Sequence, residues 1–135
     1  MKNRIYKILL VDDNKATNFF NKQILKKYGF EGEIVVKTNG LEAIEEIESS
    51  DMADIIFLDI NMPIMNGLEF LEEVQDIESY KLYTPLIVIM MGVPLHPEDL
   101  EKVKKINNVQ LMHKKMLSND AVTKVLSYLP EGIAL

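Results

Sequence analysis

The feature that most constrains the fold is a regular alternation of short apolar runs with stretches of helical spacing. The runs are rich in β-branched and long aliphatic residues and short enough to be strands: Ile8–Val11, Ile34–Val36, Ile55–Leu58, Leu86–Met91 and Val109–Met112. After each run, apolar residues recur every three or four positions, which is typical of an amphipathic helix. A strand–helix unit repeated five times predicts a parallel sheet with helices on both faces, a (βα)5 fold of the α/β class.

Capping residues support the predicted helices. Asn39 precedes the second helical stretch, where its side chain can cap the first turn. Pro97 stands at the start of the fourth stretch, where its missing N–H is not needed. In the first stretch, the apolar face is predicted to carry Phe20, Ile24 and Tyr28, which repeat every four residues.

Composition excludes several classes of protein. The chain has 135 residues, of which 47% are hydrophobic, so we expect one domain with a sizeable core. The net charge of −6 argues against general binding of nucleic acid or an anionic membrane surface. The absence of cysteine rules out disulfides and thiolate metal sites. No apolar stretch approaches the roughly 18 residues of a membrane span or the pattern of a signal peptide, and we expect a cytoplasmic protein.

Two of the predicted strands, the first and the third, end in aspartates. In a flavodoxin-like sheet with the strand order 2-1-3-4-5, the carboxyl ends of these strands flank the point where the strand order reverses, so Asp12, Asp13 and Asp59 should meet there. Three converging carboxylates repel one another, and a hard divalent cation such as Mg²⁺ relieves that repulsion. Lys114 follows the fifth strand and is predicted to lie at the same edge of the sheet.

A carboxylate, a divalent cation and a lysine together suit phosphoryl transfer to an aspartate. The carboxylate attacks phosphorus, while the cation and the ammonium neutralise charge on the phosphoryl oxygens. Asp59 is the predicted nucleophile, because the strand end holds it at a rigid and accessible point. The turn over residues 62–67, which contains a proline and a glycine, then carries the backbone clear of the incoming group.

Five segments of the chain resemble the receiver domain of the two-component response regulators. They are "ILLVDDN", "TNGLEAI", "IIFLDINMPIMNG", "TPLIVIM" and "LMHKKML". The segment around the third strand is the most specific of them. The resemblance covers roughly residues 5–129, and we expect residues 1–135 to form a single receiver domain.

The resemblance implies roles for individual residues. Asp59 would accept a phosphoryl group from the phosphohistidine of a histidine kinase or a histidine phosphotransfer protein. Asp12 and Asp13 would bind Mg²⁺ together with Asp59 and the backbone carbonyl of Asn61, and Lys114 would pair with the phosphoryl group. Because the chain ends shortly after the resemblance does, we expect a single-domain regulator that signals through protein contacts. It would catalyse only its own phosphoryl transfer and autodephosphorylation.

The chain departs from the family where a receiver usually converts phosphorylation into a change of shape. Met90 aligns with the serine or threonine that usually ends the fourth strand, and residues 85–117 contain neither residue type. Leu111 aligns with the usual aromatic residue of the fifth strand, and residues 85–127 contain no phenylalanine, tyrosine or tryptophan. Lys115 stands where a proline usually follows the lysine. Phosphorylation is therefore chemically possible, whereas the usual threonine–aromatic switch is absent.

Two other functions are open at this point. A degenerate receiver would bind a partner without phosphate, and Met90 and Leu111 favour that interpretation, while the intact acidic set opposes it. A hydrolase with an aspartyl nucleophile of the haloacid dehalogenase type would need a second acid two residues after Asp59, where the chain has Asn61. The methionines between residues 62 and 116 are either core filling or an adaptable partner surface.

Overall fold

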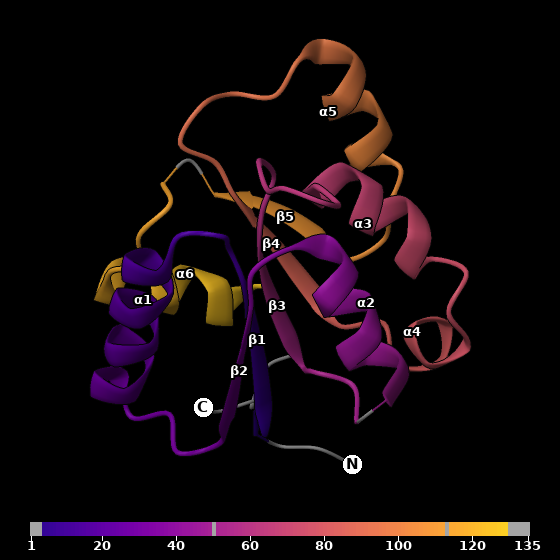
Figure 1. The fold of residues 1–135 in the computed structure, drawn as a ribbon. Coiled ribbons are helices and arrows are strands. Elements are labelled where there is room, and N and C mark those ends of the chain that lie inside the picture. The colour runs from indigo at the N-terminus through magenta and orange to yellow at the C-terminus, as the bar shows by residue number, and fades with distance from the viewer. Residues whose placement is uncertain (1–3, 50, 113, 130–135) are drawn as a thin grey trace.

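A five-stranded parallel sheet forms the centre of the molecule (Figure 1). The structure is a computed structural model that describes residues 4–49, 51–112 and 114–129. The strand order is β2-β1-β3-β4-β5, with bounds β1 (Lys7–Val11), β2 (Glu33–Lys37), β3 (Ile55–Asp59), β4 (Leu86–Met90) and β5 (Val109–Met112). The predicted fold class and strand order are confirmed. The single-domain organisation of residues 1–135 stays a prediction, because it includes residues outside the described part.

Helices cover both faces of this sheet, as the doubly wound arrangement requires. In the described part of the chain they are α1 (Lys15–Tyr28), α2 (Gly40–Ser49), α3 (Gly67–Val74), α4 (Glu78–Tyr83), α5 (Pro97–Lys104) and α6 (Asn119–Ser127). Figure 1 shows α1 and α6 on one face and α2, α3, α4 and α5 toward the other. The prediction of one helix after each strand missed α4, which lies between α3 and β4. Of its six residues only Tyr80 is buried, and the helix has no side-chain cap. Neither apolar periodicity nor a capping residue therefore predicts this helix from the sequence.

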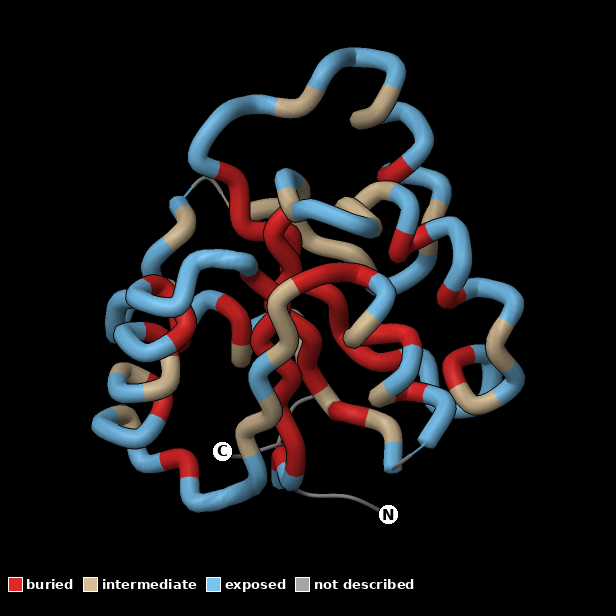
Figure 2. Tube along the Cα trace, in the orientation of Figure 1, coloured by how far each residue is buried: buried red, intermediate tan, exposed pale blue. Residues whose placement is uncertain are grey.

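The core consists of two apolar clusters, one on each face of the sheet. β1, β3 and β4 are buried along their whole length, as the red central trace in Figure 2 shows. Alternate residues of each strand enter opposite clusters: Leu9 and Leu58 pack with α2 and α3, whereas Leu10 and Phe57 pack with α1 and α6. Because the core holds these strands in place, the residues that follow them lie at defined positions at one edge of the sheet.

Most helix ends follow the capping signals of the sequence. Asn39 accepts a hydrogen bond from the backbone N–H of Glu42 at 2.9 Å, and Pro97 is the first residue of α5, as predicted. At the end of α1, Gly29 adopts a left-handed conformation with φ of 116°, which glycine tolerates best.

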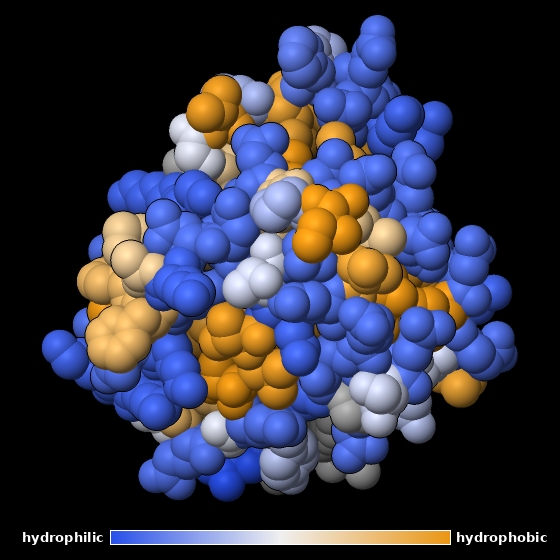
Figure 3. Space-filling model, viewed as in Figure 1, coloured by the Kyte–Doolittle hydropathy of each residue, from blue (hydrophilic) through white to orange (hydrophobic). Residues whose placement is uncertain are grey.

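β2 is an edge strand and is less buried than its neighbours. Val36 is 37% exposed, and Figure 3 shows apolar side chains reaching the surface over β2 between α1 and α2. This edge lies at the opposite end of the strand order from β5 and contributes a backbone carbonyl to the site described next.

Candidate functional site

Three carboxylates meet at the carboxyl edge of the sheet. β1 and β3 are paired with Val11 opposite Leu58, so the residues that follow them come together. One carboxylate oxygen from each of Asp12, Asp13 and Asp59 lies within 4.8 Å of the other two. Asp12 and Asp59 are buried, whereas Asp13 is exposed. The structure thus brings together the three acids that the sequence placed at this point.

Asp12 is held from three directions. Its backbone N–H donates to the carbonyl oxygen of Lys37, and its own carbonyl oxygen accepts from the Asn18 side chain at 2.7 Å. Its Oδ1 atom accepts from the backbone N–H of Asn14 at 2.9 Å, which leaves Oδ2 to face the site. The carboxylate is therefore preorganised by local hydrogen bonds.

The loop after Asp59 turns back tightly against the strand. The backbone N–H of Gly67 donates to the carbonyl oxygen of Ile60 at 2.8 Å. A Cβ at residue 67 would lie 2.5 Å from the carbonyl oxygen of Asp59, closer than such atoms approach, so this return path requires glycine. α3 then starts at once, with Asn66 and Glu69 forming a capping box. Asp59, Asn61 and Asn66 line one cavity, so the turn leaves open space beside Asp59.

The lysine that reaches the acids is Lys115, and the prediction of Lys114 is wrong by one residue. The Nζ atom of Lys115 lies 3.3 Å from Asp59 Oδ2 and 3.5 Å from Asp12 Oδ2, whereas Lys114 is exposed. The loop register explains the error. Leu117 enters the core and Ser118 caps α6, and these two anchors direct the second of the tandem lysines inward.

The electrostatics of the site show an excess of negative charge. Burial raises the pKa of the Asp59 carboxyl above its ordinary value, and the charge of Asp12 raises it further, while Lys115 and the backbone N–H of Asn61 lower it only in part. Burial lowers the pKa of the Lys115 ammonium, but the carboxylates of Asp12 and Asp59 together outweigh that effect and hold it above its ordinary value. One ammonium therefore compensates the buried carboxylates incompletely.

The donor set fits a hard divalent cation. Three carboxylates with oxygens within 4.8 Å of one another are the ligands that Mg²⁺ prefers, and Asp13 is exposed and open to a hydrated ion. The raised pKa of Asp59 shows that a further positive charge would be stabilising at this point. Asp12, Asp13 and Asp59 are thus the side chains that would hold the ion.

Met90 lies directly beside the predicted phosphoacceptor, since the register of β3 and β4 pairs it with Asp59. Its neighbour on β5 is Met112, whereas Leu111 pairs with Ile89 and packs on the other face of the sheet. Because Lys115 is the lysine that contacts the acids, the alignment with the family shifts by one residue in this segment. Met112 then takes the position of the usual aromatic residue, and Met116 takes that of the usual proline. The proposed departure from the usual switch remains, with different residues: two neighbouring methionines stand at the strand ends.

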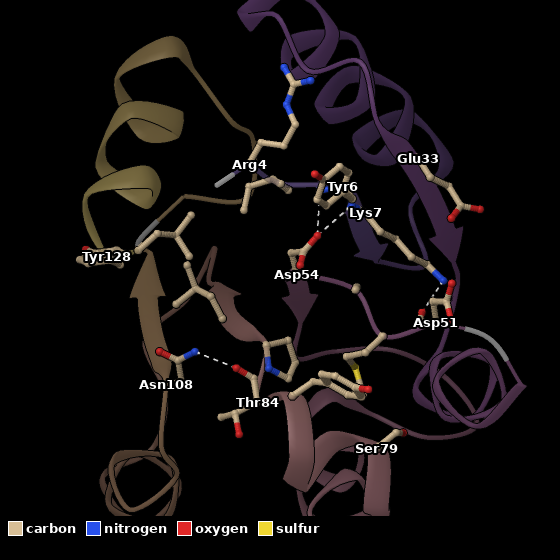
Figure 4. A pocket seen from close by; sticks show the side chains of 17 residues that line it. Arg4, Tyr6, Lys7, Glu33, Asp51, Asp54, Ser79, Thr84, Asn108 and Tyr128 are labelled. Carbon is tan, nitrogen blue, oxygen red and sulfur yellow. Dashed lines mark hydrogen bonds between the residues drawn. The ribbon is translucent and has the colours of Figure 1, made fainter. Parts of the chain in front are cut away.

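Two cavities lie at opposite ends of the strands. One of about 500 Å³ adjoins the site and is lined by Asp59, Met90 and Lys115 among others. A larger one of about 1150 Å³ lies at the amino ends of the strands (Figure 4). There Asp54 accepts hydrogen bonds from the backbone N–H groups of Tyr6 and Lys7, which ties β1 to the start of β3. The larger cavity is therefore separate from the acidic site.

Sequence reasoning missed a set of asparagines that support the site from α1. Asn18 and Asn21 are buried and contact the backbone of the site loops, whereas Phe20, predicted to lie on the buried face, is 39% exposed. The available signal was the spacing of Asn14, Asn18 and Asn21, which places polar residues on one face of the helix.

The fold and the acidic site define a class of protein, and comparisons with known proteins give the same class. Residues 8–126 match the model of the response regulator receiver domain. The chain belongs to the receiver domain family of two-component signalling.

Individual relatives agree with this assignment. The chain is 31% identical over 83 residues to chemotaxis protein CheY1 of Helicobacter pylori, covering 62% of this chain and 65% of that protein. It is 44% identical over 68 residues to protein-glutamate methylesterase/protein-glutamine glutaminase 3 of Rhodospirillum rubrum, covering 50% of this chain but only 18% of that protein. A two-component response regulator from Cytophaga hutchinsonii superposes with a TM-score of 0.76 at 26% identity, over 92% of this chain and 96% of that one. No helix in the described part is long and apolar enough to cross a membrane.

Proposed function

We propose that the chain is a response regulator that accepts a phosphoryl group on Asp59 from a phosphohistidine of a histidine kinase or a histidine phosphotransfer protein. The observation that carries the proposal is the position of one ammonium between two buried carboxylates. Lys115 Nζ lies 3.3 Å from Asp59 and 3.5 Å from Asp12 at the edge of the sheet where β1 and β3 end. A receiver needs a nucleophile and a cation in this relation.

The proposed step is an in-line displacement at phosphorus. An Oδ atom of Asp59 forms a bond to phosphorus, while the bond between phosphorus and the donor imidazole nitrogen breaks. The electron pair of the broken bond stays on the imidazole nitrogen. Lys115 exchanges part of its contact with Asp59 for contact with the phosphoryl oxygens, where negative charge gathers.

Asp12 and Asp13, with Asp59 and the backbone carbonyl of Asn61, are the groups that would hold Mg²⁺. When bound, the ion supplies charge neutralisation for the carboxylate and the phosphoryl oxygens. Without a bound cation, burial and the charge of Asp12 disfavour the ionised form of the Asp59 carboxyl and raise its pKa. The protein's own contribution is to hold Asp12 by the hydrogen bonds from Asn14 and Asn18.

The phosphorylated protein would signal through contacts with another protein. The exposed apolar side chains Ile64, Val93 and Met116, which belong to the loops after β3, β4 and β5, support this idea. These loops surround the carboxyl edge of the sheet, so a partner that reads them would also meet the modified aspartate. The single-domain organisation stays part of the proposal.

The test is the intact mass of the protein after incubation with phosphoramidate, a small donor with a phosphorus–nitrogen bond, and Mg²⁺. We expect one added phosphoryl mass. The adduct should be absent in Asp59→Asn and in wild type with a chelator. Failure of the wild-type protein to form the adduct, with phosphoramidate or with a phosphorylated histidine kinase, would refute the proposal.

A phosphate-independent binding module is the second candidate. The pair Met90 and Met112 favours it, because neither side chain can donate a strong hydrogen bond to a phosphoryl group. The same mass measurement separates the two functions. A protein that shows no adduct yet captures its partner equally well as wild type and as Asp59→Asn would be such a module.

A further inference from the structure

Asn21 is a buried asparagine in the middle of α1, with 3% of its surface exposed. Its Nδ2 atom donates to the carbonyl oxygen of Lys115 at 3.3 Å, and its Oδ1 atom accepts from the backbone N–H of Leu117 at 2.9 Å. Burying an amide is costly unless it is hydrogen-bonded, and an aliphatic residue at this position would avoid that cost. Both ends of the Asn21 amide are thus engaged with the loop that carries Lys115.

The two hydrogen bonds span Met116 and restrict the backbone of this short loop. Lys115 is a long side chain, 36% exposed, on a segment between β5 and α6 that has no proline to stiffen it. The direction of such a side chain depends on the orientation of its own backbone. Leu117 is buried and anchors the far end of the loop, so Asn21 holds the remaining part.

The same helix also holds the acidic partner of Lys115. Three positions before Asn21, the Nδ2 atom of Asn18 donates to the carbonyl oxygen of Asp12 at 2.7 Å. One face of α1 therefore binds the loop after β1 and the loop after β5 at once. This arrangement fixes the separation of Asp12 and Lys115, whose charged atoms lie 3.5 Å apart.

We propose that Asn21 is a positioning residue for the phosphoryl transfer. It orients Lys115 toward Asp12 and Asp59 by holding the backbone on both sides of Met116. Asn21 contacts neither the donor nor the reacting carboxylate, so its effect passes through Lys115. The inference rests on the proposed function for its effect on the reaction, but its effect on the lysine is independent of phosphate.

The first test measures the position of Lys115 without any phosphoryl group, by NMR of the lysine side chain in metal-free protein. Replacing the neighbouring carboxylate by Asp59→Asn should shift the Lys115 Cε–Hε resonance, because the charge lies 3.3 Å from Nζ. In the Asn21→Leu background, which removes both hydrogen bonds, that shift should be largely lost. Asn21→Ala serves the same purpose if Asn21→Leu does not fold.

The matched control for this test is Asn39→Ala. Asn39 is also a buried asparagine with a backbone hydrogen bond, but it caps α2 beside β2, at the far edge of the sheet from β5. The control should keep the full shift of the Lys115 resonance. A shift of equal size in the Asn21 variants and the control would overturn the proposal.

The second test measures the rate of Asp59 phosphorylation by phosphoramidate. Asn21→Leu should slow it roughly tenfold, in keeping with the cost of a small misplacement in an active site, while Asn39→Ala should not. In a Lys115→Met background, Asn21→Leu should cause no further slowing. Equal slowing with and without Lys115 would show a general structural effect and overturn the proposal. Absence of any wild-type adduct would refute the proposed function instead, and the lysine resonance would still decide the role of Asn21.

Discussion

Tandem lysines give the sharpest contrast at the scale of single residues. Lys115 lies 3.3 Å from Asp59, whereas Lys114 is exposed on the same loop. We expect Lys115→Met to slow phosphorylation of Asp59 by about 10²- to 10³-fold, the usual effect of removing one preorganised stabilising group. Lys114→Met should leave the rate unchanged. Rates from intact mass against time, with phosphoramidate and Mg²⁺, provide the comparison, and equal losses in both variants would contradict the assignment of Lys115.

The carboxyl of Asp59 gives a second prediction at this scale, for the metal-free protein. Its folded-state pKa is raised, so between the unfolded value of about 3.9 and the folded value the native state binds more protons than the unfolded state. The free energy of unfolding therefore falls as the pH rises through that window. At neutral pH, Asp59→Asn removes this penalty and should be more stable than wild type by something on the order of 1 kcal/mol.

Urea unfolding in the presence of a chelator measures the difference. The advantage of Asp59→Asn should shrink as the pH falls from the folded-state pKa toward about 3.9, and it should vanish below that value, because the wild-type carboxyl is then protonated in both states. A variant less stable than wild type at neutral pH would show that contact with Lys115 outweighs the burial of Asp59.

At the scale of structural elements, the main prediction concerns the carboxyl ends of β4 and β5. Met90 and Met112 lie side by side where receivers usually have a hydroxyl and an aromatic ring, so the fold lacks the hydrogen bond that would pull β4 toward a phosphoryl group. Loss of a charge-assisted hydrogen bond forfeits roughly 1.5–3 kcal/mol of preference for the active shape. We therefore expect a phosphoryl mimic to perturb the loops after β3 and β4 more than β5 and α6.

Backbone amide shifts with and without beryllofluoride and Mg²⁺ test this expectation. The loop around Lys115 should respond, since the lysine contacts Asp59 directly. Large shifts throughout β5 and α6 would show that the two methionines couple the site to that face by another route.

The contrast between β1 and α1 explains how much of the fold the sequence predicts. Strands such as β1 are short, apolar and covered on both faces, so composition alone locates them. Once β1 is located, Asp12 and Asp13 are the residues that directly follow it. In α1, apolar periodicity does not identify the buried face, because the helix packs polar residues against the site loops. Phe19 is 66% exposed, while Asn18 and Asn21 are buried.

The remaining errors have local causes. The choice between two adjacent lysines depends on the path of a loop, and apolar patterning does not determine that path. Leu117 determines the path of this loop by entering the core, and its backbone N–H donates a hydrogen bond to Asn21 that holds the loop in place. α4 was missed because one buried residue, Tyr80, cannot establish a helical period.

The whole molecule should respond to Mg²⁺ through its folding equilibrium. A cation that binds the folded acidic site and not the unfolded chain stabilises by mass action, by about 1.4 kcal/mol at ten times the dissociation constant. We expect Mg²⁺ to raise the thermal midpoint of wild type and to have a smaller effect on Asp13→Asn. Thermal unfolding followed by circular dichroism over a Mg²⁺ titration measures both. Identical responses would count against Asp13 as a ligand.

Among the three clustered acids, Asp59 is the residue proposed to carry the phosphoryl group. The most direct test of this proposal is chemical trapping: phosphorylated protein is reduced with borohydride, which converts an aspartyl phosphate to homoserine, and the modified residue is located by fragment mass spectrometry. We expect homoserine at residue 59 and unmodified Asp12 and Asp13. Homoserine at either of those two positions, or no conversion in protein that carries the added phosphoryl mass, would contradict the proposal.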